Sequence, residues 1–198
     1  MTMSFQPGLI EIQLPEWIDR FLTGYPGYIS SIQDRMSFVI EAAQRNISEG
    51  TGGPFAAAIF ETESGKLISL GVNLVISQGL SILHAEMVAF ALAQKKIGSY
   101  DLGRQDLAAH ELVTSIEPCA MCFGAIPWSG VRRVITGARD SDARSIGFDE
   151  GPKMKDWRIE LEKRGIATIC DISREAAARV LLNYASQGGK IYNSRESA

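Results

Sequence analysis

The sequence has few cysteines, no long apolar run and no block of basic residues. Three of its 198 residues are cysteine, which is too few for a disulfide framework, and two of them stand as C-x-x-C, a spacing typical of metal or redox chemistry. No apolar stretch reaches the roughly 18 residues that predict a transmembrane helix. The first eight residues lack the features of a signal peptide. We therefore expect a soluble, cytoplasmic protein.

Neither sign of charge dominates. The chain has 20 Lys and Arg against 23 Asp and Glu, which gives a formal net charge of −3. The arginines between 132 and 144 are interleaved with acids, which is typical of a solvated face. Binding to a nucleic-acid backbone depends on clustered Lys and Arg, so we do not expect a nucleic-acid partner.

The length suits one domain that buries about 70% of its unfolded surface. Residues 1–30 are punctuated by Pro and Gly and predict an N-terminal extension packed on a domain formed by residues 31–198. In that domain, hydrophobic periodicity predicts helices over 31–49, 84–97, 119–128, 153–164 and 173–184, strands over 55–60, 67–72, 112–116, 131–136 and 166–172, and a polar loop over 140–151. This alternation predicts a layered α/β domain whose sheet is partly parallel.

Two short runs carry the residues best suited to chemistry, His84-Ala85-Glu86 and Pro118-Cys119-Ala120-Met121-Cys122. Cys119 and Cys122 are three residues apart at the start of a predicted helix, where they share one face and where the helix N-terminus favours thiolates. Two thiolates and the neutral imidazole of His84 would balance the charge of Zn²⁺. They would leave its fourth tetrahedral position open, as in a catalytic zinc site.

Glu86 distinguishes this interpretation from simpler ones. A C-x-x-C pair alone also occurs in redox sites and in zinc ribbons. A ribbon needs a second ligand pair, which the sequence lacks, and a redox site leaves His84 and Glu86 unexplained. A carboxylate beside an open zinc position can take a proton from water and return it to a substrate. We therefore predict one catalytic zinc ion held by His84, Cys119 and Cys122, with Glu86 as a catalytic acid and base.

These motifs resemble the H-x-E…P-C-x-x-C signature of the zinc-dependent cytidine deaminase superfamily. The resemblance covers about residues 31–184 and implies a three-layer α/β/α fold around a five-stranded mixed sheet. Within the superfamily the chain is most similar to guanine deaminases. The stretches that carry this similarity are Gly52-Gly53-Pro54-Phe55, Asn73, Trp128 and Gly147-Phe148-Asp149-Glu150.

The resemblance implies hydrolytic deamination of a free aminopurine base, with guanine as the first expectation and xanthine and ammonia as products. Zinc-bound hydroxide would attack, Glu86 would shuttle the proton, and Glu150 would act as a second catalytic acid. The expected substrate-binding residues are Asn73, Ala85, Trp128, Phe55, Phe148 and Tyr192. The family also implies a homodimer, in which a C-terminal tyrosine closes the site and is sometimes lent to the partner. Tyr192 is the first candidate for that tyrosine and Tyr184 the alternative.

Other interpretations stay open at this point. Phe55 and Trp128 also suit core positions, Asn73 a turn, and Glu150 a solvated loop. The same superfamily includes deaminases of tRNA adenosine and of nucleotides, and an aminotriazine would present a similar edge to the pocket. A zinc-stabilised interaction protein without catalysis is a further alternative, and the presence of Glu86 disfavours it.

Overall fold

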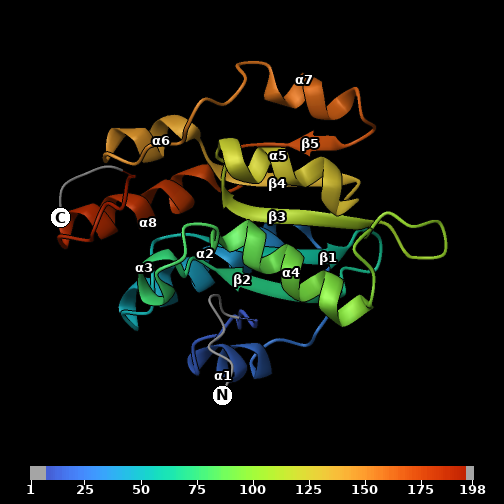
Figure 1. Ribbon diagram of the computed structural model, residues 1–198, viewed down its shortest axis with the longest axis horizontal. Coiled ribbons are helices and arrows are strands. Elements are labelled where there is room, and N and C mark those ends of the chain that lie inside the picture. Colours follow the sequence, from blue (N-terminus) through green and yellow to red (C-terminus); the bar gives the residue numbers. More distant parts are fainter. Residues whose placement is uncertain (1–7, 195–198) are drawn as a thin grey trace.

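The computed structural model describes residues 8–194, so the predictions for residues 1–7 and 195–198 lie outside its described part. A five-stranded sheet forms its centre (Figure 1). The strands are β1 (Ala56–Glu61), β2 (Leu67–Val72), β3 (His110–Ile116), β4 (Arg133–Ala138) and β5 (Ala167–Ile169), in the order β2-β1-β3-β4-β5. Strand β1 is antiparallel to β2 and β3, whereas β3, β4 and β5 are parallel. The sheet is therefore mixed, which confirms the predicted fold class.

Helices cover both faces of the sheet. Helices α4 (Ala85–Ile97) and α5 (Ala120–Ser129) lie on one face in Figure 1, and α2 (Ile32–Ser48) and α8 (Arg174–Ser186) pack against the sheet and each other. Among the described residues, no helix combines the length and apolarity needed to cross a membrane.

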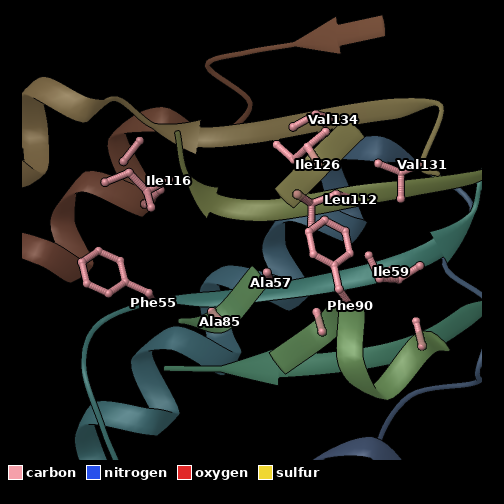
Figure 2. Packing of buried hydrophobic residues seen from close by; sticks show 14 of the residues in the cluster. Phe55, Ala57, Ile59, Ala85, Phe90, Leu112, Ile116, Ile126, Val131 and Val134 are labelled. Atoms are coloured by element: carbon pink, nitrogen blue, oxygen red, sulfur yellow. The ribbon is translucent and has the colours of Figure 1, made fainter. Parts of the chain in front are cut away.

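The alternation of side chains along β1 divides the core in two. Ala57 and Ile59 belong to the cluster beneath α4 and α5, whereas Ala58 and Phe60 belong to the cluster that includes α2. Successive strand residues point to opposite faces, so a strand that is apolar throughout can be covered on both sides. Figure 2 shows the first cluster, in which Phe90 of α4 lies against the sheet.

The N-terminal extension, as far as the structure describes it, packs on the domain. Helix α1 (Trp17–Thr23) buries Trp17 and Phe21, and the ring of Phe21 stacks on Phe38 of α2 at 5.2 Å between centroids. Helix α2 begins as predicted, because the Ser31 hydroxyl accepts a hydrogen bond from the Asp34 amide at 3.0 Å.

Three local predictions need correction. The predicted loop over 140–151 begins with helix α6 (Asp140–Ser145), whose Asp142 carboxylate accepts a hydrogen bond from the Arg139 amide. The polar composition did not predict this helix, because charged side chains satisfy the amides at its N-terminus and only Ala143 is buried. Helix α7 (Trp157–Glu162) and β5 are shorter than predicted, and a short helix, α3 (Val75–Gln78), follows β2.

One edge of the sheet collects the segments that carry the predicted site residues. Ala57 near the start of β1 pairs with Gly71 near the end of β2 and with Thr114 near the end of β3. Ile116 at the end of β3 pairs with Ala138 at the end of β4. The chain before β1 and after β2, β3 and β4 therefore converges there, which is where α/β sheets commonly bind ligands.

Candidate active site

The three predicted metal ligands come together at two helix starts. His84 precedes α4, Cys119 precedes α5, and Cys122 lies in the first turn of α5. The Nδ1 atom of His84 lies 3.4 Å from Sγ of Cys119 and 3.7 Å from Sγ of Cys122. All three ligand atoms lie within 4.8 Å of one another. This is the distance range that a single ion can bridge.

The chemistry of the cluster fits zinc. In the metal-free cluster, a hydrogen bond from Cys122 lowers the pKa of the Cys119 thiol to about 4 and raises the pKa of Cys122 well above its usual value, so the two thiols keep one proton that zinc binding would release. A metal ligand must be deprotonated, and sulfur and imidazole are the donors that Zn²⁺ prefers. With three protein ligands, one tetrahedral position stays available to water or substrate.

Gly71 of β2 lets the start of α4 approach the sheet. A Cβ atom at Gly71 would lie 2.3 Å from the Ala85 carbonyl oxygen and 2.5 Å from the Ala89 amide nitrogen. Both distances are shorter than any tolerated contact, so a side chain would push the helix and its first residues away. The placement of His84 thus depends on this glycine, which lies outside the sequence motifs.

Glu86 lies beside the metal cluster and is only 4% exposed. The Thr114 hydroxyl donates a hydrogen bond to Oε1 of Glu86 at 3.1 Å, and the Cys122 thiol lies 3.4 Å from Oε2. Burial raises the pKa of the Glu86 carboxyl above its usual value. The carboxyl is thus held in one orientation and can carry a proton, as expected of a general acid and base. Thr114 is a supporting residue that the sequence analysis did not single out.

A cavity of about 400 Å³ opens over this cluster. That volume is at the lower end of the usual range for small-molecule sites. The predicted residues that line it are Phe55, Asn73, His84, Ala85, Glu86, Cys119, Phe148, Glu150 and Tyr192. Cys122 is buried beneath them.

Glu150 faces the same cavity from the loop after α6. Its backbone carbonyl accepts a hydrogen bond from the Ala120 amide at 2.9 Å, which ties this loop to the first turn of α5. Burial raises the pKa of the Glu150 carboxyl to about 8, with contributions from Cys119 and Glu86. The cavity therefore contains two carboxyls, and Glu150 is predominantly protonated at neutral pH in the metal-free protein.

Aromatic rings form a second wall of the cavity. Phe148 contacts Phe55 edge to face at 5.0 Å and Tyr192 at 5.1 Å between centroids. Tyr192 belongs to the same chain as the rest of the pocket, and its buried hydroxyl has no hydrogen-bond partner among the described residues. Tyr184, the alternative closing tyrosine, instead donates a hydrogen bond to the Lys190 carbonyl.

Asn73 is held at the end of β2 by its backbone. Its amide donates to the Phe55 carbonyl at 3.0 Å, and its carbonyl accepts from Nδ2 of Asn46 at 2.9 Å. The same Asn46 nitrogen donates to the Gly53 carbonyl at 2.9 Å. Asn46 is fully buried and thereby joins two strand ends, a role that the apolar stripe of α2 gave no reason to assign.

Trp128 does not line this cavity, so the prediction for it is not met within the chain. It lies nine residues beyond Cys119, a distance of roughly 14 Å along a helix. Its side chain is 84% exposed and borders a separate cavity of about 630 Å³, together with Phe123 and Met154. The start of α5 faces the pocket, whereas its end faces outward.

Comparisons with known proteins agree with this geometry. Residues 29–138 match the family model described as "Cytidine and deoxycytidylate deaminase zinc-binding region". A solved structure of guanine deaminase from Nitrosomonas europaea is 42% identical, with a TM-score of 0.87, and the match covers 92% of this chain and 100% of that chain. Guanine deaminase from Bacillus subtilis is 36% identical over 64% of this chain and 77% of its own length. A tRNA-specific adenosine deaminase from Buchnera aphidicola is 34% identical over 60% and 72%.

Proposed function

We propose that this chain, which belongs to the cytidine and deoxycytidylate deaminase zinc-binding family, hydrolyses guanine to xanthine and ammonia. One observation carries the proposal. A single cavity over the three-ligand cluster is lined by His84 and Cys119, by two carboxyls and by Asn73, beside an aromatic wall. A flat base needs that wall for stacking, and its deamination needs proton transfer on both sides of the reacting carbon. The similarity to two guanine deaminases selects guanine among the possible bases.

Each side chain has a defined task. When bound, zinc supplies the Lewis acidity that makes water a nucleophile near neutral pH. Glu86 takes the proton from that nucleophile and delivers it to the ring nitrogen next to the reacting carbon. Glu150 faces the same cavity and gives a proton to the departing amine, and the hydroxyl proton released from the adduct as the carbonyl forms restores the protonated carboxyl. The side-chain amide of Asn73 offers a donor and an acceptor to the purine edge. Phe148 packs against the base.

The test is direct turnover of guanine by the zinc-loaded protein. Ammonia release and the ultraviolet change from guanine to xanthine should rise together and in equal molar amounts. Absence of turnover by protein that contains one zinc ion per chain would contradict the proposal. The control is the same assay with cytosine and adenine, for which we expect far lower rates.

Deamination of adenosine in tRNA is the second candidate, because a tRNA-specific adenosine deaminase is 34% identical to this chain. The net charge of −3 disfavours it, since affinity for RNA depends on clustered positive charge. Tight tRNA binding that weakens steeply with salt, together with inosine formation, would favour this candidate over guanine.

The outward face of α5 supports the further proposal that the protein is a homodimer. The helix has no charged residue, and it exposes Met121, Gly124 and the 84%-exposed ring of Trp128. A self-complementary apolar patch of this kind suits a twofold interface between copies of one chain. Trp128→Ala should shift the protein from dimer towards monomer in analytical ultracentrifugation. A monomeric mass for the unsubstituted protein in the same measurement would contradict the proposal.

We place the protein in the cytoplasm on the basis of its thiols. Its three cysteines are unpaired, and two of them belong to the zinc cluster, which requires them reduced. Fractionation of cells that express the full chain is the measurement that tests this placement.

A further inference from the structure

Residues 189–194, here called the C-terminal strap, lie across the pocket of their own chain. The Tyr184 hydroxyl donates to the Lys190 carbonyl at 2.7 Å and fixes the beginning of the strap on α8. Tyr192 then enters the pocket, where a Cβ atom at Gly53 would lie 2.5 Å from its hydroxyl oxygen. The ring of Tyr192 therefore fills a space that is available only because residue 53 has no side chain. The φ angle of Gly53 is not positive, so other residues could adopt its backbone conformation. The contact with Tyr192 is therefore the reason that a larger residue does not fit at position 53.

Asn193, the next residue of the strap, forms two hydrogen bonds with the loop that carries Phe148 and Glu150. Oδ1 of Asn193 accepts a hydrogen bond from the Asp149 amide at 2.8 Å, and Nδ2 of Asn193 donates to the Gly147 carbonyl at 2.8 Å. The two bonds flank Phe148 and immediately precede Glu150. One side chain thus holds the backbone of the loop that carries both the aromatic wall and the second carboxyl.

We propose that Asn193 is a positioning residue that joins the C-terminal strap to the Glu150 loop, so that Tyr192 and Glu150 close the purine pocket as one unit. The identity of the substrate rests on the function proposed above, whereas the joint itself rests only on these contacts. Phe148 touches Tyr192 directly, so movement of the strap without the loop would break that packing. These two hydrogen bonds therefore hold the strap and the Glu150 loop in one arrangement relative to each other.

The closing experiment uses two measurements on the zinc-loaded protein and its Asn193→Ala and Asn193→Asp variants. The first is hydrogen exchange of the Asp149 amide without substrate. We expect exchange to be about tenfold faster in Asn193→Ala, as for the loss of a pair of hydrogen bonds. Asn193→Asp should be intermediate, because a carboxylate still accepts from the Asp149 amide but cannot donate to Gly147. Asn183→Ala, on the exposed face of α8, is the matched control and should behave as the unsubstituted protein.

The second measurement is the steady-state kinetics of guanine deamination. Asn193→Ala should raise KM about tenfold and lower kcat by a smaller factor, because the loop that carries Glu150 is held less firmly whereas the zinc cluster and Glu86 are untouched. Unchanged exchange at Asp149 would overturn the proposal, and so would a parallel loss of kcat and thermal stability, which indicates a general structural role. If the Asp149 amide exchanged faster in Asn193→Ala but the unsubstituted protein did not deaminate guanine, the role of Asn193 would be supported and the proposed substrate rejected.

Discussion

The two walls of the pocket are built in different ways. His84 and Glu86 stand at the start of α4, which packs directly on the sheet, and Cys119 stands at the start of α5, which packs on α4. The opposite wall, with Phe148, Glu150 and Tyr192, consists of a loop and a strap that are joined by hydrogen bonds between the Asn193 side chain and the loop backbone. The metal ligands and Glu86 therefore rest on the packed core, whereas Glu150 and the aromatic residues that face the base rest on a loop and the C-terminal strap. Substitutions on the first wall should lower kcat, and substitutions on the second wall, Glu150 excepted, should act mainly on binding.

The largest expected effect belongs to the first wall. Glu86→Gln removes the proton shuttle but retains size and burial, so kcat should fall by about a thousandfold, within the range for general acid–base catalysis. Zinc content, measured by elemental analysis, should stay at one per chain. Glu63→Gln, at an exposed position, is the control. Retention of a tenth of the activity by Glu86→Gln would remove Glu86 from the mechanism.

The carboxyl of Glu150, on the second wall, should contribute less to catalysis than the carboxyl of Glu86. Glu150→Gln cannot exchange a proton with the amine, and we expect kcat/KM for guanine to fall about a hundredfold. Glu150→Asp keeps the carboxyl but shortens the side chain, so its kcat/KM should lie between the values of the unsubstituted protein and of Glu150→Gln. If Glu150→Gln lowered activity as much as Glu86→Gln, the two walls would contribute equally to the chemistry, contrary to this expectation.

The sequence predicted these two walls with different success. Spacing within a helix start identified His84, Glu86, Cys119 and Cys122, because such ligand sets depend on short-range geometry. It did not identify Asn46, Thr114 or Asn193, whose roles depend on hydrogen bonds between segments 27 to 46 residues apart. An isolated polar residue in an apolar strand or stripe was the available signal for the first two.

The fold was predicted for a similar physical reason. The alternation of apolar strands with helices predicted a layered, partly parallel sheet, and the resemblance to the deaminase superfamily implied the five-stranded mixed arrangement. The pattern did not predict helix α6, because its stability comes from ion pairs such as Arg174 to Asp142 rather than from an apolar face. The exposure of Trp128 also lay beyond the pattern, since an apolar helix is covered or exposed according to what packs on it.

Gly53→Ala tests the space that Tyr192 fills without removing any polar group. The added methyl would overlap the Tyr192 ring, and overpacking of this kind costs about 1–3 kcal/mol. KM for guanine should therefore rise roughly tenfold, with kcat nearly unchanged. Gly24→Ala, where a Cβ atom meets only the Phe21 carbonyl at 3.4 Å, is the matched control. An unchanged KM in Gly53→Ala would show that Tyr192 does not need this space.

The smallest expected effect lies in the frame, far from both walls. Ser31→Ala removes the oxygen that accepts from the Asp34 amide and should lower the free energy of unfolding by about 1 kcal/mol. Ser37→Ala in the same helix should be neutral or slightly stabilising, because Ala is the better helix former and the Ser37 hydroxyl only bonds the Gln33 carbonyl. Urea unfolding of the zinc-loaded variants measures both. The kinetic constants of both variants should match those of the unsubstituted protein. A change in KM caused by Ser31→Ala would mean that α2 transmits its stability to the pocket through Asn46, and that the frame and the pocket are coupled.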